Sequence, residues 1–222
     1  LVAAGINELN NSETVSELAK GIRSVADKFE VSVIGGDLSK SEKMTLSITA
    51  LGELSAQPIL RSGGRVGDII YLSSLTGLSA AGLAILNRDL DRPRYVVEAH
   101  LNPKLVAPDK LIKVATSMCD VSDGLATDAA HLANASAVNF NLSKDLISKA
   151  DDFKDLAELA KELNEDVFDW ILTGGEDHFF LATVDKKNES SELGIKIGIV
   201  EKGDGKLLLD GIEIKESGYQ HF

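Results

Sequence analysis

The stretch CDVSDGLATDAAHLA, residues 119–133, places two carboxylates and a hydroxyl directly before a helical pattern. Asp120, Ser122 and Asp123 come first, and apolar residues then recur at helical spacing, at Leu125, Ala129, Leu132 and Ala133. Ser and Asp are favoured N-cap residues, and acids in the first turn oppose the positive end of the helix dipole. Capping therefore explains part of the pattern. One cap does not need two aspartates and a serine, so a binding role stays open.

The composition is that of an ordinary folded protein with an acidic surface. A chain of 222 residues with 44% hydrophobic content fits one large domain or two small ones. The formal net charge of −12 argues against nucleic acid as a partner, because binding to its backbone relies on many Lys and Arg contacts. Carboxylates can hold Mg²⁺, and Mg²⁺ binds phosphates, so nucleotides remain candidate ligands.

The sequence also bears on the cellular compartment. Cys119 is the single cysteine, which excludes an internal disulfide framework and fits a reducing cytosol. No apolar run reaches the length of a membrane span, and no signal-peptide pattern opens the chain. We therefore expect a cytoplasmic protein without a membrane partner.

The pattern of elements changes near residue 57. Before it, residues 12–29 are amphipathic at helical spacing, residues 31–37 predict a short buried strand, and residues 44–54 predict a strand with one buried face. One helix and two strands are too few to bury a core of their own. We therefore predict an incomplete first domain over residues 1–57 that needs a partner.

From residue 58 onward, strands alternate with helices. The predicted strands are 68–74, 138–142, 179–184 and several short ones after residue 193, joined by Gly-Asp-Gly and Asp-Gly turns. The predicted helices are 79–90, 95–101, 108–118, one beginning near residue 125, material within 143–163, and 167–173. The fold class is therefore α/β (α+β), with a nearly complete second domain over residues 58–222.

Three places put acids beside glycines: residues 35–37, 120–124 and 174–177. Adjacent glycines let the backbone approach a ligand and expose N–H groups to phosphate oxygens. Each place also has a plainer interpretation, such as a turn between strands or the end of a helix. Three of them at the ends of predicted elements favour a phosphate and metal site, although no Walker A, GxGxxG or kinase-loop motif is present.

Six stretches resemble, in order and approximate spacing, the thiamine-monophosphate kinase family. They are GGDLSKSEKMTLSITALGEL, RSGGRVGDIIYLSS, SAAGLAIL, DVSDGLATDAAHLA, LTGGEDHFFLATV and the terminal GYQHF. This family belongs to the superfamily of aminoimidazole-ribonucleotide synthetase, selenophosphate synthetase and the hydrogenase maturation factor of the same fold. The resemblance covers essentially the whole chain, and DVSDGL and LTGGED are the stretches most specific to the kinase branch.

The resemblance implies a function and a site. It implies a homodimer that uses ATP and Mg²⁺ to phosphorylate thiamine monophosphate to thiamine diphosphate by direct transfer. Catalysis would depend on Asp120 and Asp123. The matched positions are the Mg²⁺ ligands Asp37, Asp120 and Asp123, the ATP-binding residues Gly36, Asp37, Arg61 and Ser122, and the thiamine contacts Glu176 and Tyr219.

The resemblance also has departures. It implies that a preceding part of the ATP-binding and dimerisation domain, with an Asp-Asp metal motif, is missing from these 222 residues, so we expect them alone to bind nucleotide weakly and to lack turnover. His178 replaces the tyrosine usual after GGED. Two other hypotheses remain: another ATP-dependent synthetase of the superfamily, or a truncated, non-catalytic module that binds nucleotide or metal.

Overall fold

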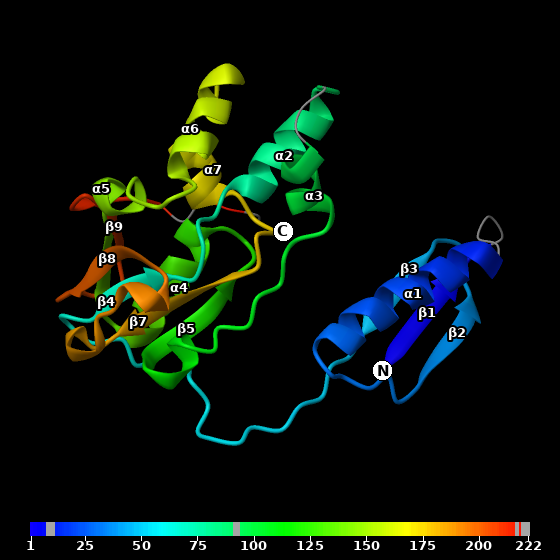
Figure 1. The fold of residues 1–222 in the computed structure, drawn as a ribbon. Coiled ribbons are helices and arrows are strands. Elements are labelled where there is room, and N and C mark those ends of the chain that lie inside the picture. Colours follow the sequence, from blue (N-terminus) through cyan, green and yellow to red (C-terminus); the bar gives the residue numbers. More distant parts are fainter. Residues whose placement is uncertain (8–11, 91–93, 216–217, 219–222) are drawn as a thin grey trace. The chain divides into compact units, whose positions relative to one another are not determined.

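The computed structural model describes residues 1–7, 12–90, 94–215 and 218 of the chain (Figure 1). The chain divides into two compact units, which we call unit 1 (Leu1–Gln57) and unit 2 (Pro58–Phe222). Among the described residues, none of the helices combines the length and apolarity needed to cross a membrane.

Unit 1 contains a three-stranded sheet and one helix. Its elements are β1 (Val2–Ile6), α1 (Ser12–Lys28), β2 (Gly36–Lys40) and β3 (Thr45–Ile48). The strand order is β2-β1-β3, with β1 parallel to β2 and antiparallel to β3. The amphipathic pattern correctly predicted α1 and, over a shorter span, β3.

Two predictions for unit 1 were wrong. The strand β1 was not predicted, because its residues Val-Ala-Ala-Gly-Ile show no polar alternation. A buried strand was predicted at 31–37, whereas β2 begins only at Gly36 and all of its residues are exposed. The apolar run Val31–Ile34 has no strand assignment, because β1 pairs with β2 from Val2 opposite Gly36 onward.

Unit 2 is built on one large mixed sheet. Its strands are β4 (Ile69–Leu72), β5 (Ala115–Val121), β6 (Asn139–Leu142), β7 (Phe179–Val184), β8 (Ile195–Glu201), β9 (Leu207–Leu209) and β10 (Ile212–Glu213). Among the described residues they follow the order β10-β9-β6-β8-β4-β7-β5. All neighbouring pairs are antiparallel except β6 and β9, and β5 forms an edge of the sheet.

The helices of unit 2 mostly follow the predicted pattern. They are α2 (Leu78–Asn87), α3 (Arg94–Leu101), α4 (Leu125–Ser136), α5 (Lys144–Ile147), α6 (Phe153–Glu162) and α7 (Val167–Thr173), with short 3₁₀ turns at Leu111–Lys113, Lys186–Asn188 and Ser191–Leu193. The predicted helix at 108–118 was wrong. This segment holds a 3₁₀ turn and the start of β5, which gains backbone partners from β7.

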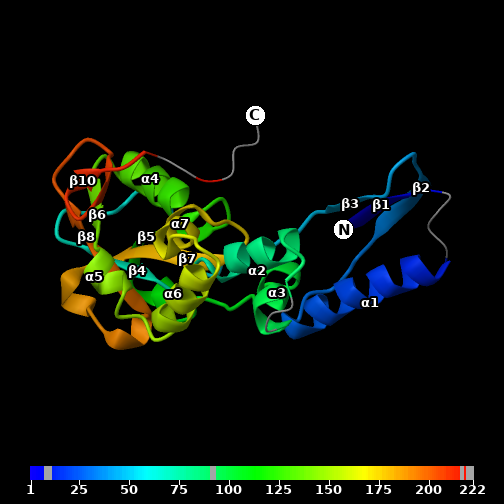
Figure 2. The same ribbon diagram turned by 90° about the horizontal axis from the view of Figure 1, so that it is seen from above.

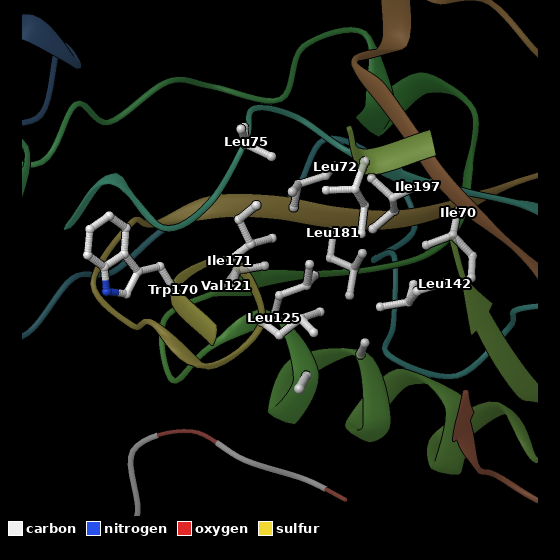
Figure 3. Close-up of a cluster of buried hydrophobic side chains, with 14 of the residues drawn as sticks. Ile70, Leu72, Leu75, Val121, Leu125, Leu142, Trp170, Ile171, Leu181 and Ile197 are labelled. Carbon is white, nitrogen blue, oxygen red and sulfur yellow. The ribbon is translucent and has the colours of Figure 1, made fainter. Parts of the chain in front are cut away.

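The sheet of unit 2 is covered on both faces. Along β4, Ile70 and Leu72 join the main core, whereas Ile69 and Tyr71 join a smaller cluster on the opposite face. All four are essentially inaccessible to solvent, which explains why a continuous apolar run forms this strand. Figure 3 shows Leu125 of α4 and Leu181 of β7 within the main core.

The helices of unit 2 pack on the sheet and on one another. The helix α4 packs on β5, β6, β7 and α7, and α2 packs on α3, α6 and α7 (Figures 1 and 2). Because α4 begins directly after the DVSDG loop and lies against β5, the sheet fixes the position of that loop.

Candidate functional site

The DVSDG loop lies at the end of the edge strand β5. Asp120 is exposed near the end of the strand, and Ser122 and Asp123 follow it, both half-buried. Within the described part of the chain, the side chains of Asp120 and Asp123 have no hydrogen-bond donor or cation as a partner. Two carboxylates without partners thus stand three residues apart in the sequence, just before the start of α4.

Capping does not explain these carboxylates. The N-cap of α4 is Gly124, and no side chain makes a cap hydrogen bond there. A different acid holds the loop: Asp128, on the first turn of α4, accepts hydrogen bonds at Oδ2 from the backbone N–H groups of Ser122 (3.1 Å) and Asp123 (3.3 Å). The loop is therefore fixed from behind, which leaves the carboxylates of Asp120 and Asp123 to bind something else.

Sequence reasoning missed Asp128, although a signal was present. Asp128 follows Leu125 by three residues and precedes Ala129, so it lies on the apolar side of α4, and it is buried in the structure. Burial raises the pKa of Asp128, while the two backbone hydrogen bonds act in the opposite direction. A buried carboxylate with backbone partners is typical of a residue that fixes a loop.

The glycine turn at 174–178 contacts the DVSDG loop directly. The N–H of Glu176 donates to the carbonyl of Ser122 (2.9 Å), and the N–H of His178 donates to the carbonyl of Val121 (3.1 Å). A Cβ at Gly175 would lie 2.6 Å from the carbonyl oxygen of Ser122, so this close approach requires glycine. The structure thus brings together two of the three acid and glycine motifs.

The same turn carries backbone strain. Gly174 ends α7, as the sequence predicted, but Glu176 (φ 68°) and His178 (φ 54°) both adopt left-handed conformations. Such conformations cost about 1 kcal/mol or more for residues other than glycine, and they concentrate at functional sites. The exposed carboxylate of Glu176 is 3.3 Å from Nε2 of His178. The strain and the exposed acid both indicate a binding role for this turn.

Asp177, also missed from the sequence, connects the turn to α2. Its carboxylate accepts hydrogen bonds from the N–H groups of Gly77 (2.6 Å) and Ser79 (3.0 Å). Burial raises the pKa of Asp177 to about 6, although these hydrogen bonds and nearby His178 and His100 oppose the rise. No sequence spacing pointed to this contact, because its partners lie about a hundred residues away.

The Arg61 loop runs along the free edge of β5. The N–H of Met118 donates to the carbonyl of Leu60 (3.1 Å), and the hydroxyl of Ser136 at the end of α4 contacts Arg61, Gly63 and Gly64. Arg61 itself is exposed. Arg61 and Asp120 both act electrostatically on Cys119, which places the guanidinium and the carboxylate around the same part of β5.

Cys119 is a free, partly buried thiol next to the DVSDG loop. Its thiol lies 4.0 Å from the carbonyl oxygen of Asp128, and the side chain packs against the main core. Burial, with the nearby charges of Asp128 and Asp120, raises the pKa of Cys119. A thiol that stays protonated is a poor nucleophile, so the interpretation as a small apolar residue agrees with this environment.

Gly36 and Asp37 lie in unit 1, at the start of β2. A Cβ at Gly36 would lie 1.8 Å from the carbonyl oxygen of Val2. The pairing of β2 with β1 is therefore sufficient to explain the glycine at this position. Asp37 is exposed and accepts a hydrogen bond from the hydroxyl of Ser39 (2.6 Å). Tyr219, the other expected thiamine contact, lies outside the described residues.

The donor set of unit 2 fits Mg²⁺ but does not enclose it. Mg²⁺ prefers oxygen ligands and is commonly held by one or two carboxylates together with substrate phosphates and water. Asp120 and Asp123 supply two such carboxylates. No group of three or more His, Cys, Asp or Glu side chains able to hold a metal occurs in the part of the chain that the structure describes. A metal here would therefore need ligands from elsewhere.

Comparisons with known proteins agree with this arrangement. The family model for the N-terminal domain of AIR synthase related proteins matches residues 1–54. The thiamine-monophosphate kinases of Aquifex aeolicus and Archaeoglobus fulgidus are 30% and 32% identical to the chain, over 91% and 96% of its length. The matches span 67% and 69% of those relatives, and 62% of the 32% identical enzyme of Mycobacterium tuberculosis. The chain thus spans about two thirds of these relatives.

Solved structures show the same similarity. AaThiL complexed with AMPPCP and TMP superposes with a TM-score of 0.85 at 27% identity, covering 100% of this chain and 72% of that protein. The hydrogenase maturation protein HypE of E. coli superposes with a TM-score of 0.72 at 16% identity, covering 100% of this chain and 74% of HypE. The second similarity concerns the fold alone. The mixed α/β fold class was therefore correctly predicted from the sequence.

Proposed function

Because the chain belongs to the thiamine-monophosphate kinase family, we propose that the protein carrying these residues phosphorylates thiamine monophosphate to thiamine diphosphate with ATP. One structural observation carries the proposal: the DVSDG loop and the strained Glu176 turn are joined by backbone hydrogen bonds of 2.9 and 3.1 Å. A metal-binding carboxylate pair and a separate acidic turn thereby form one rigid surface. Such a surface suits a reaction between two anionic substrates.

The proposed reaction is a direct in-line transfer. A phosphate oxygen of thiamine monophosphate forms a bond to the γ-phosphorus of ATP while the bond to the β–γ bridging oxygen breaks, and ADP leaves. This reaction requires little covalent chemistry from the protein, which acts by positioning the phosphates and by offsetting their charge. When bound, Mg²⁺ supplies positive charge to the phosphate oxygens.

Each residue has a separate part in this proposal. The proposed Mg²⁺ ligands are Asp37, Asp120 and Asp123, and catalysis depends on Asp120 and Asp123. The ATP-binding residues are Gly36, Asp37, Arg61 and Ser122, and the thiamine contacts are Glu176 and Tyr219. Arg61 contributes a planar fork of donors for phosphate oxygens. Its exposed position beside β5 leaves the guanidinium accessible to a ligand.

We also propose that the protein is a cytoplasmic homodimer assembled through unit 1. The apolar side chains of β2 and β3 support this, because Leu38, Leu46 and Ile48 are all exposed in the single chain. An exposed apolar edge strand is a ready surface for pairing with a second copy.

The test compares one substitution in the DVSDG loop with a control substitution outside the loop. Calorimetry measures binding of Mg²⁺·ATP and thiamine monophosphate to the 222-residue chain, and ³¹P NMR measures thiamine diphosphate formation in the natural protein. We expect Asp123→Asn to abolish Mg²⁺-dependent turnover and to leave unfolding unchanged. The control Asp145→Asn removes an exposed acid of α5 that pairs with Lys149, and should leave both readouts unchanged.

The outcomes separate the parts of the proposal. Near wild-type turnover of Asp123→Asn at saturating Mg²⁺ would remove Asp123 from the metal site. For Glu176→Gln, weakened binding of thiamine monophosphate with unchanged binding of ATP supports the thiamine-side role, and an effect confined to ATP contradicts it. Absence of thiamine diphosphate from the natural protein, with ADP formed on another acceptor, would favour another synthetase of the superfamily.

A further inference from the structure

The Arg61 loop, residues 61–68, is held by a hydroxyl group at the C-terminal end of α4. Oγ of Ser136 accepts hydrogen bonds from the N–H groups of Gly63 (3.2 Å) and Gly64 (3.1 Å), and it donates one to the carbonyl of Arg61 (3.3 Å). A serine hydroxyl has one donor and two acceptor lone pairs. The loop therefore uses the full hydrogen-bonding capacity of Ser136.

These contacts change the role of the two adjacent glycines. Such a pair often exposes N–H groups to phosphate oxygens, but the N–H groups of Gly63 and Gly64 are already bound to Ser136. A Cβ at Gly63 would clash with the carbonyl oxygen of Thr116, so the loop also lies directly against β5. The glycines thus allow close packing, and contact with a phosphate falls to a side chain, that of Arg61.

The far end of the loop is held by a buried carboxylate. Asp68 accepts hydrogen bonds at Oδ2 from the N–H of Arg65 (3.0 Å) and from the hydroxyl of Thr116 (2.6 Å), and only 4% of its surface is exposed. Arg61 lies at the other end of the loop, where the hydroxyl of Ser136 binds the backbone. The segment that carries the guanidinium is therefore fixed by a side chain of α4.

The same helix holds both of the loops to which ATP-binding residues are assigned. On its first turn, Asp128 binds the N–H groups of Ser122 and Asp123, and at its other end Ser136 binds the Arg61 loop. An α-helix rises 1.5 Å per residue, so the two anchoring residues are about 12 Å apart along the axis. Because most residues of α4 are buried, the helix is a rigid connection between the two loops.

We propose that Ser136 is a positioning residue for nucleotide binding, whose hydroxyl holds the Arg61 loop so that the guanidinium of Arg61 reaches the phosphates of ATP. This inference rests on the proposed function, because it concerns the nucleotide side of the same site. It has a specific consequence. Loss of the hydroxyl weakens the binding of ATP through Arg61, and it leaves thiamine monophosphate unaffected, because the acceptor contact assigned to Glu176 lies on a different turn.

A double-mutant cycle on the natural protein separates positioning from a general structural role. Calorimetry measures the dissociation constant of Mg²⁺·ATP for the wild type, Ser136→Ala, Arg61→Ala and the double variant, and that of thiamine monophosphate for Ser136→Ala. The matched control is Ser148→Ala, because Ser148 is an exposed serine at the C-cap of α5. Urea unfolding of the 222-residue chain, followed by Trp170 fluorescence, measures the stability of unit 2 in each variant.

Two further variants change the same contact in other ways. Ser136→Thr keeps the hydroxyl, and therefore should restore the binding of Mg²⁺·ATP. Gly64→Ala leaves Ser136 in place but puts a Cβ 3.2 Å from its Oγ, which displaces the loop from the opposite side. Gly64→Ala takes the place of Ser136→Ala in the cycle with Arg61→Ala if Ser136→Ala does not fold.

We expect Ser136→Ala to raise the dissociation constant of Mg²⁺·ATP about fivefold, in keeping with the loss of hydrogen bonds that fix a loop. The dissociation constant of thiamine monophosphate should not change. In the Arg61→Ala background, Ser136→Ala should have no further effect, because residues that act through one another are not additive. Gly64→Ala should weaken the binding of ATP, and Ser148→Ala should match the wild type.

The failure of the inference differs from the failure of the proposed function. If Ser136→Ala binds Mg²⁺·ATP as Ser148→Ala does, or weakens its binding equally with and without Arg61, Ser136 does not act through Arg61 and the inference is overturned. Equal weakening of the binding of ATP and thiamine monophosphate would overturn it too, because it would show a general structural role. If the natural protein binds no Mg²⁺·ATP, the proposed function falls together with the inference.

Discussion

Units 1 and 2 share amphipathic patterning but differ in burial. In unit 1, α1 has no buried residue, and the strand residues Leu38 and Ile48 expose 62% and 60% of their surface. In unit 2, Ile70 and Leu72 expose none of theirs. Unit 2 has enough layers to cover its sheet on both sides, whereas three strands and one helix cannot. The hydrophobic pattern thus indicates which face of a helix or strand is apolar. The number of helices and strands in the unit decides whether that face is buried within the chain.

The largest expected effect is a cavity in the core of unit 2. Phe140 of β6 is fully buried, and Phe140→Ala should lower the free energy of unfolding of unit 2 by about 3–5 kcal/mol. The matched change in unit 1, Leu38→Ala, should alter stability by no more than about 0.5 kcal/mol, because its side chain is already exposed. Urea unfolding followed by Trp170 fluorescence and by far-UV circular dichroism measures both. Equal losses would show that unit 1 has a core of its own.

The second effect is a pH dependence confined to unit 2. The pKa of Asp177 is raised from 3.8 to about 6 by burial, so its contribution favours the folded state while the group is protonated. That stability is fully present below the unfolded pKa and is lost as the pH rises through about 6. The loss amounts to at most about 3 kcal/mol.

Asp177→Asn isolates this contribution. Unfolding of unit 2 is measured by Trp170 fluorescence from pH 4 to 7, and the wild-type curve should fall relative to that of the variant over this interval. His100 and His178 lie close enough to favour the charged carboxylate when protonated, so they reduce the slope without reversing it. Parallel curves for the two proteins would mean that Asp177 titrates near its ordinary value.

Much of unit 2 could be predicted from its sequence because each element carries its own signal. The apolar run of β4, the stripe of α4 and the helix–turn–strand at 167–184 are all local patterns. The segment 108–118 is different. Its spacing suits a helix, yet pairing with β7 makes most of its second half a strand, which is a case of tertiary contacts overriding local preference.

The candidate site divides in the same way. Residues that present side chains to a ligand, such as Asp120, Asp123 and Glu176, stand in short acid and glycine motifs that the sequence displays. The groups that hold these residues in place do not stand in such motifs. Asp177 binds amides of α2 that lie about a hundred residues earlier, and no spacing rule predicts such a contact. The sequence therefore indicated the ligand-facing groups, and the fold was needed to find those behind them.

A third prediction concerns Asp128, which fixes the DVSDG loop. Asp128→Ala removes the acceptor of two backbone N–H groups and should lower the free energy of unfolding by about 1–3 kcal/mol. Hydrogen exchange at Ser122 and Asp123 should accelerate more than exchange within β7. The matched variant Asp145→Ala removes an acid whose side chain is largely exposed and should change neither measurement. Unchanged exchange at the loop would show that the turn at 174–178 holds it without Asp128.

The smallest effect on folding should come from the exposed face of β3. Leu46 and Ile48 alternate with Thr45 and Ser47 along this strand, so neighbouring substitutions probe opposite faces. Ile48→Lys places a charge on the apolar face, and Ser47→Lys places the same charge on the other. Neither should change the unfolding of unit 2 by more than about 0.5 kcal/mol. Light scattering should nevertheless separate them: if unit 1 forms the dimer through this face, Ile48→Lys is monomeric and Ser47→Lys keeps the wild-type mass. Equal masses for both variants would place the assembly surface elsewhere, and the exposure of β3 would then be a property of unit 1 unrelated to dimerisation.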